Sequence, residues 1–227
     1  MRAATSTGAQ AAALAAIQSI RALPVTNTPA LRKIRRQWSA ALKSQAPAYV
    51  LRFAEHLLSH ASWPARLVAY EVIAAHPATF ATLTHRHIER MARGLADWGS
   101  IDLFGVTVSG PAWRADRLST LQVRTWARSR DRWRRRLALV STVPLNVPSR
   151  GGRGDAARTL DICARLLDDR EPMVIKALSW ALRALAKRDP NAAEKFLSRR
   201  EHPLPARVLR EVRNVLDSGV KRPSRSH

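Results

Sequence analysis

The chain has 227 residues, of which 46% are hydrophobic, so it is long enough for one domain with a substantial core and rather short for two. It contains 39 Lys and Arg residues against 17 Asp and Glu residues, which gives a formal net charge of +22 at pH 7. Such a charge is not expected of an enzyme that acts on neutral metabolites. It favours a polyanionic partner over a basic surface that serves only solubility.

Apolar residues recur with a period near 3.6 and alternating runs are rare, so the chain is predicted to be all helical. In chain order, helices are expected near residues 8–22, 28–43, 47–60, 63–76, 79–93, 119–129, 131–143, 155–168, 171–187, 190–198 and 204–217. Many short helices joined by tight turns favour an α-solenoid over a globular bundle, although no repeat can be aligned by eye.

Three parts are distinguished by composition: an Ala-rich N-terminal helix or arm at 1–27, a main helical domain at 28–220, and a basic, disordered tail at 221–227. Within the main domain, "PLNVPSRGGRGD" at 144–155 is rich in Pro and Gly. Its composition predicts a flexible connector, and the alternative is contact between its two arginines and nucleic acid.

Few features point to metals, disulfides or membranes. The single cysteine, Cys163, cannot form a disulfide within the chain, and His56 and His60 have no third metal ligand at a suitable spacing. No run approaches the roughly 18 consecutive apolar residues of a membrane span, and residues 11–20 precede no convincing signal-peptide cleavage site. We expect a cytoplasmic, nucleoid-associated bacterial protein that does not contact membranes.

The stretch "ADWGSIDLFGV" at 96–106 places a carboxylate, Asp102, in an apolar run. If the segment is helical, Trp98 and Asp102 share one face at a spacing of i, i+4. The alternative is that Trp98 continues the core phase of the preceding helix and that Asp102 caps a backbone amide.

The stretch "RSRDRWRRRLALV" at 128–140 has six arginines in nine residues. Its buried face is predicted to comprise Trp133, Leu137 and Val140. Mutual repulsion between the arginines favours a phosphate-facing helix over a merely solvated one. Arg136 lies nearest the core boundary, where a fixed guanidinium could hold a phosphate through two parallel hydrogen bonds.

The helix expected at 171–187 carries a third cluster. A buried stripe is predicted for Val174, Leu178, Ala181, Leu182 and Leu185. Trp180 lies outside this stripe, on the basic side, with Lys176, Arg183 and Lys187. An aromatic ring among cations is typical of a nucleic-acid platform, and the alternative is a tryptophan that shields a neighbouring helix. The tryptophans outside the three clusters are expected in the core or between helices: Trp38, Trp63, Trp113 and Trp126.

The order "DWGSIDLFG", "WRRRLALV", "PMVIKALSWALRALAKRDP" and "PARVLREVRNVL" resembles the AlkD-like DNA alkylation repair glycosylases, from about Leu31 to Lys221. The resemblance implies an α-α superhelix of HEAT-like repeats with a basic concave face that holds duplex DNA. It also implies removal of N3- or N7-alkylated purines without metal or cofactor, and we expect a monomer.

The resemblance further implies that Trp98, Asp102 and Trp180 surround the lesion nucleotide, while Arg136 holds the nearby backbone. Arg135 is the other match for this arginine, because the alignment can slip by one residue. The cations expected to contact DNA are Arg132, Arg134, Arg135, Lys176, Arg183 and Lys187.

On this hypothesis, Asp102 stabilises the oxocarbenium-like sugar that forms as a cationic purine leaves, and it orients the attacking water. Two alternatives keep the helical fold. One is a non-catalytic HEAT-repeat module that binds damaged or branched DNA, and the other is a helical scaffold for an acidic protein.

Overall fold

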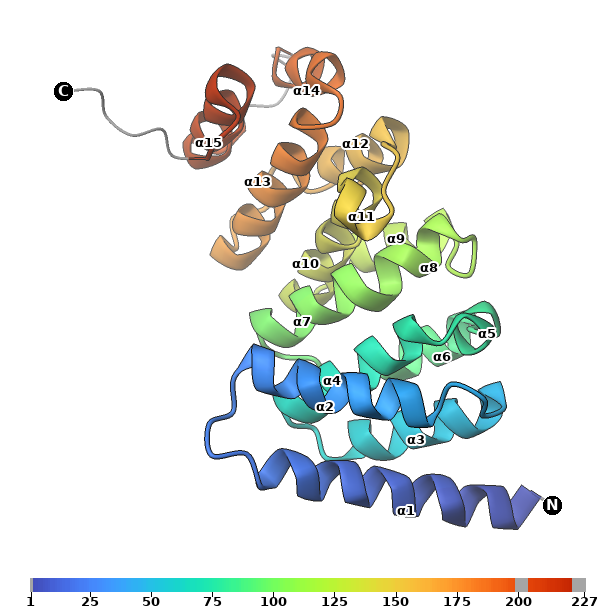
Figure 1. Cartoon of the computed structure of the whole chain (residues 1–227). Helices are drawn as coiled ribbons and strands as arrows, with labels where there is room; N and C mark the ends of the chain where they lie inside the picture. Colours follow the sequence, from blue (N-terminus) through green and yellow to red (C-terminus); the bar gives the residue numbers. More distant parts are fainter. Residues whose placement is uncertain (1, 199–203, 222–227) are drawn as a thin grey trace. The chain divides into compact units, whose positions relative to one another are not determined.

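The computed structural model describes residues 2–198 and 204–221, and within these ranges every regular element is helical (Figure 1). The predicted all-α class is confirmed. The contacts divide the chain into two compact units, one up to Gly94 and the other from Leu95 onward. Apart from Lys221, the basic tail expected at 221–227 lies outside the described residues.

The first unit consists of α1 (Arg2–Arg21), α2 (Thr28–Ala41), α3 (Pro47–Ser59), α4 (Trp63–Ala75), α5 (Pro77–Ala81) and α6 (His85–Met91). Helix α3 packs between α1 and α4, and α2 also packs on α4. Glu71 of α4 accepts hydrogen bonds from Arg32 and Arg35 of α2, at 2.9 and 3.1 Å. Because α1 packs on α3, the N-terminal helix is part of this unit.

The single helix predicted for 79–93 is instead two short helices, α5 and α6. His76 caps α5 by accepting a hydrogen bond from the Thr79 amide, at 3.1 Å. Thr84 then starts α6 through a capping box with His87. Because a capping residue has extended backbone, the Thr84 cap interrupts the helical path that the apolar period suggested.

The second unit begins with one continuous helical run made of α7 (Trp98–Phe104), the π-helical turn η1 (Gly105–Ser109) and α8 (Gly110–Arg114). It continues with α9 (Thr120–Ala127), α10 (Arg132–Val140), α11 (Val143–Asn146), the 3₁₀ turn η2 (Pro148–Arg150), α12 (Ala156–Ala164), α13 (Pro172–Ala186), α14 (Pro190–Leu197) and α15 (Ala206–Ser218). Helix α13 is central, because α10, α11, α12, α14 and α15 all pack on it. Its predicted apolar stripe is buried, which confirms that helix face.

Two glycines let the first run of this unit approach α10 closely. A Cβ atom on Gly105 would lie 2.5 Å from Val140 Cγ1, and one on Gly110 would lie 2.6 Å from the carbonyl oxygen of Ser141. The hydroxyls of Ser109 and Ser141 are hydrogen-bonded at 2.7 Å in the same buried contact. The absence of side chains at these glycines therefore lets η1 and the start of α8 lie close to the C-terminal end of α10.

The Pro- and Gly-rich stretch at 144–155 differs from the connector predicted by its composition, because it contains α11 and η2. The amide of Gly154 donates to the Leu145 carbonyl at 2.9 Å. The buried Asn146 side chain donates to Thr159 Oγ1 at 2.8 Å and accepts from the Asp155 amide at 3.1 Å. A Pro/Gly-rich sequence here forms a hydrogen-bonded loop.

Candidate functional site

The centre of the candidate site is an ion pair between α7 and α10. Arg136 Nε donates to Asp102 Oδ1 at 2.9 Å, and Arg136 Nη2 donates to Asp102 Oδ2 at 2.7 Å. Arg136 Nη1 also donates to the main-chain carbonyl of Met173, in the first turn of α13. One guanidinium thus joins three helices and holds the carboxylate in a bidentate geometry.

The pair is largely buried, since the Arg136 side chain is 6% exposed and the Asp102 side chain 18% exposed. Burial raises the pKa of the Asp102 carboxyl and outweighs the hydrogen bonds and positive charge of Arg136, which lower it. The net pKa lies above the ordinary value of 3.8. The carboxylate keeps some access to solvent, and each of its oxygens has lone-pair capacity beyond the bond to Arg136.

Helix α7 is positioned by its cap, because Asp97 Oδ1 accepts a hydrogen bond from the Ser100 amide at 2.8 Å. Asp97 therefore has the capping role that the alternative interpretation gave to Asp102. Trp98, the first residue of α7, is 59% exposed, so the alternative that it is a core residue is wrong. The helix presents both Trp98 and Asp102 outside the fully buried core.

Trp180 lies half-buried on α13, outside the buried stripe as predicted. Within residues 2–198 and 204–221, the rings of Trp98 and Trp180 stack neither on each other nor on another aromatic ring. Of the four residues expected around the lesion, the structure brings Asp102 and Arg136 into contact and leaves both indole rings partly accessible.

The arginine cluster on α10 is largely satisfied within the protein. The parallel hydrogen bonds expected from Arg136 to a phosphate go instead to Asp102, because this carboxylate lies directly opposite on α7. Arg135 Nε donates to Asp169 Oδ2 at 2.6 Å. Arg132 lies 3.6 Å from Glu171 and 5.1 Å from the Trp133 ring, and Arg134 lies over the Trp126 ring. Mutual repulsion in this helix is therefore relieved in part without an external anion.

The cations predicted around Trp180 fall into two kinds. Lys176 and Lys187 are exposed, whereas Arg183 is half-buried. Arg183 Nε donates to Ser179 Oγ at 3.2 Å and lies 3.7 Å from Glu211 Oε2. Arg183 thus links the Trp180 helix to α15.

Glu211 is a buried residue that sequence reasoning missed. Its carboxylate accepts hydrogen bonds from Ser179 Oγ at 2.6 Å and Arg207 Nε at 3.0 Å, and Lys221 Nζ lies 3.3 Å away. Burial raises its pKa, but the Ser179 hydrogen bond and the charges of Lys221 and Arg207 outweigh this effect, so the net pKa lies below 4.5. The i, i+4 spacing of Arg207 and Glu211 was the available sequence signal.

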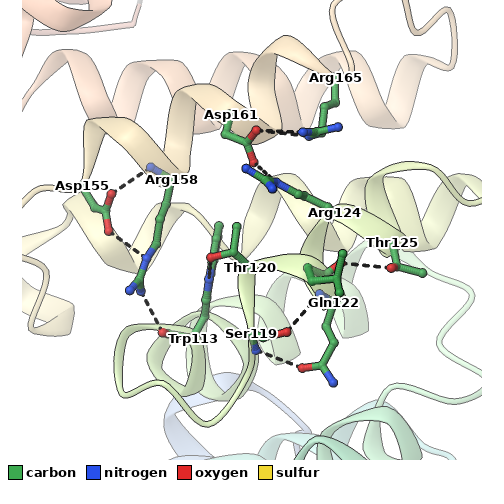
Figure 2. Close-up of polar contacts among 11 residues, drawn as sticks. Trp113, Ser119, Thr120, Gln122, Arg124, Thr125, Asp155, Arg158, Asp161 and Arg165 are labelled. Atoms are coloured by element: carbon green, nitrogen blue, oxygen red, sulfur yellow. Dashed lines mark hydrogen bonds and ion pairs between the residues drawn. The ribbon is translucent and has the colours of Figure 1, made fainter.

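A second set of ion pairs holds α9 and α12 together (Figure 2). Asp161 of α12 accepts from Arg124 Nε at 2.8 Å and from Arg165 Nη2 at 3.1 Å. Nearby, Arg158 Nη1 donates to the Trp113 carbonyl at 2.9 Å, and Trp113 Nε1 donates to Thr120 Oγ1 at 3.1 Å. Trp113 is fully buried and Trp126 nearly so, which confirms the core positions predicted for these two tryptophans.

The described ranges contain no group of three or more His, Cys, Asp or Glu side chains arranged to hold a metal ion. Within the same ranges, no helix has the length and apolar character needed to cross a membrane.

In a comparison with protein families, residues 9–216 match the family described as DNA alkylation repair enzyme. No curated protein matches the chain. The matched range covers most of both helical units and includes Trp98, Asp102, Arg136 and Trp180.

Proposed function

Because the chain belongs to the family of DNA alkylation repair enzymes, we propose that it is a DNA glycosylase that hydrolyses the N-glycosidic bond of cationic N3- or N7-alkylated purines in duplex DNA. The observation that carries this proposal is the partly exposed Asp102 carboxylate, held by both of its oxygens and one turn beyond the exposed Trp98. A carboxylate fixed in this way suits a reaction in which positive charge develops on a sugar.

In the proposed reaction, the bond between the purine nitrogen and C1′ breaks, and its electron pair neutralises the positive charge of the alkylated base. The sugar develops oxocarbenium character, which Asp102 stabilises. Water then forms the new bond to C1′ and loses a proton to solvent or through Asp102. The products are the free neutral base and an abasic site.

Arg136 acts in this scheme as a positioning residue. Its Nε and Nη2 atoms donate to the two carboxylate oxygens and so fix their positions. Its third hydrogen bond, from Nη1 to the Met173 carbonyl, connects the pair to the first turn of α13. The positive charge also keeps Asp102 from being a bare anion beside DNA phosphates, which would repel them. The carboxylate can then approach the sugar of a strongly negative substrate.

The aromatic and basic residues serve binding. Trp98 and Trp180 would place the negative faces of their rings beside the lesion and the cationic sugar. The exposed Lys176 and Lys187 provide phosphate contacts on the same helix as Trp180. Arg183 and the α10 cations Arg132, Arg134 and Arg135 would contribute mainly to the local potential, since each has a partner in the protein.

The test is release of N7-methylguanine from alkylated duplex DNA by the purified protein. We expect Asp102→Asn to lower the single-turnover rate by about a hundredfold while DNA binding is retained, by analogy with other preorganised electrostatic groups. Asp217→Asn, which removes an exposed carboxylate of α15, is the matched control and should leave the rate unchanged.

Two outcomes would contradict the proposal. Equal rates for the parent and Asp102→Asn would remove the carboxylate from the mechanism. Absence of release from several cationic lesions, with tight DNA binding intact, would exclude the glycosylase activity and leave a DNA-binding protein.

A further inference from the structure

Three arginines converge on the loop at 144–155, away from the Asp102 pair. Arg114, the last residue of α8, and Arg153 of the loop line a pocket of about 340 Å³. Arg153 and Arg188, which follows α13, line a second pocket of about 450 Å³. The two pockets share the loop backbone around Gly154. Arg153 thus lines both pockets, with Arg114 beside it in the first and Arg188 in the second.

These arginines differ from their neighbours in their contacts within the described residues. Arg124, Arg158 and Arg165 each form an ion pair with an aspartate (Figure 2). In the part of the chain that the structure describes, no carboxylate forms an ion pair with Arg114, Arg153 or Arg188.

Two of the three are instead anchored to main-chain carbonyls. Arg114 Nη1 donates to the Pro144 carbonyl at 3.0 Å, and Arg188 Nε donates to the Arg153 carbonyl at 2.9 Å. These bonds hold the guanidinium groups in place without neutralising them. Burial and the nearby positive charge of Arg153 both lower the pKa of Arg114, which is the expected effect of like charges held close together.

The loop backbone between the arginines is held by its glycines. A Cβ atom on Gly152 would lie 2.5 Å from the Pro144 carbonyl oxygen, so this position is closed to a side chain. Gly151 and Gly154 have φ angles of +77° and +99°, which favour glycine. The loop backbone that both pockets share is therefore fixed by positions that require glycine.

Two carboxylates also line these pockets, and both are engaged by helix N-termini. Asp155 Oδ1 accepts from the Arg158 amide at 2.9 Å, and its other oxygen lies 3.4 Å from Arg158 Nε. Asp189 Oδ1 accepts from the Ala192 amide at 2.9 Å. Their hydrogen bonds go to the first turns of α12 and α14, and neither carboxylate forms an ion pair with Arg114, Arg153 or Arg188 in the residues that the structure describes.

We propose that Arg114, Arg153 and Arg188 form a phosphate-binding site distinct from the Asp102 site. A guanidinium presents paired donors that match two phosphate oxygens, and the pocket volumes accommodate such a group. The helical run from Asp102 to Arg114 spans on the order of 15–20 Å, given a rise of about 1.5 Å per residue. If the phosphate belongs to DNA, which rests on the proposed function, it lies several nucleotides from the lesion.

The test compares Arg153→Gln with Arg117→Gln. Arg153 is exposed, so its replacement should not disturb folding, and Arg117 is an exposed arginine three residues beyond Arg114 that does not line the pockets. Affinity for an undamaged duplex is measured at several NaCl concentrations. Loss of one phosphate contact should reduce the salt slope by about 0.9 for Arg153→Gln alone.

A second arm uses inorganic phosphate at constant ionic strength and follows the Tm of the parent and both variants. A phosphate-dependent rise in Tm that is lost only in Arg153→Gln identifies a site for free phosphate. A reduced salt slope for Arg153→Gln without this Tm effect identifies a phosphodiester group of DNA as the ligand of the site. Either result supports the site.

The proposal is overturned if neither readout changes. It is also overturned if Arg117→Gln changes both as much as Arg153→Gln, because phosphate would then be attracted by the general positive potential of the surface and not by a local site. Neither arm measures base release. Failure of the glycosylase proposal would therefore be recognised separately.

Discussion

At the scale of single residues, the defining feature of this protein is a carboxylate whose charge is matched by one buried arginine. Asp102 and Arg136 are 34 positions apart in sequence and share two hydrogen bonds. Removing either partner leaves the other partly buried without an opposite charge. This lowers the free energy of unfolding more than removing both partners does. The pair therefore couples stability to the geometry of the proposed site.

We expect Arg136→Gln to lower the free energy of unfolding by about 2–4 kcal/mol, because Asp102 then remains without its cation. Urea denaturation of Arg136→Gln, Asp102→Asn and the double variant measures the coupling. The double variant should be less destabilised than the sum of the two single variants. Strict additivity would show that the pair contributes no interaction energy.

The pH dependence of the rate of base release should reflect the ionisation of the Asp102 carboxyl. Because burial raises its pKa above 3.8, the ionised fraction falls at a higher pH than for an ordinary aspartate. The single-turnover rate, corrected for release without protein, should decline on acidification with a midpoint above 3.8. The residual rate of Asp102→Asn should lack this decline. A midpoint below 3.8 in the parent would contradict the assigned environment.

At the scale of helices, α13 connects the two polar networks of the second unit. The main-chain carbonyl of Met173, in its first turn, accepts from Arg136, and Ser179 in its middle donates to Glu211 of α15. Trp180 immediately follows Ser179, so the Glu211 network supports the helix that presents the predicted platform. The contact between α13 and α15 thus bears on the site through helix position.

We expect Glu211→Gln to lower stability by about 1–3 kcal/mol at neutral pH, because it removes a charged acceptor from Ser179, Arg207 and Lys221. The Glu211 pKa is lowered in the folded state, so this stabilisation is present above pH 4.5 and is lost as pH falls through the folded pKa. Thermal unfolding of parent and variant across this range measures the difference. A Tm difference that persists in strong acid would contradict the ionic origin of the effect.

At the scale of the whole molecule, the dominant quantity is the net charge of +22. Much of the positive charge in the second unit is neutralised locally, as the pairs on α9, α10, α12 and α15 show. Attraction to a polyanion therefore depends on the cations that lack such partners. Lys176 and Lys187, for which the described residues supply no ion pair, lie on the same helix as Trp180 of the predicted aromatic platform.

Lys176→Gln and Lys187→Gln should each weaken duplex binding and reduce the slope of log affinity against log salt by about 0.9. Lys195→Gln, an equal charge change on the exposed side of α14, should have a smaller effect. Fluorescence anisotropy with a labelled duplex provides the measurement. Equal slopes for all three variants would indicate that α13 has no special role in DNA contact.

The sequence by itself determined the features that depend on local spacing. The 3.6-residue period predicted the all-α class and the buried stripe of α13, and both are confirmed. It also predicted that Arg136 lies at the core boundary and that Trp180 lies outside the stripe. These properties follow from which face of a single helix is apolar, so near neighbours in sequence are sufficient to specify them.

Only the tertiary structure decided which charges meet. The pairing of Arg136 with Asp102, of Arg135 with Asp169 and of Glu211 with Ser179 joins residues more than 30 positions apart. Their contact depends on where separate helices touch, as at Gly105, where an absent side chain admits Val140. Such contacts are set by packing in three dimensions, and the helical period carries no information about them.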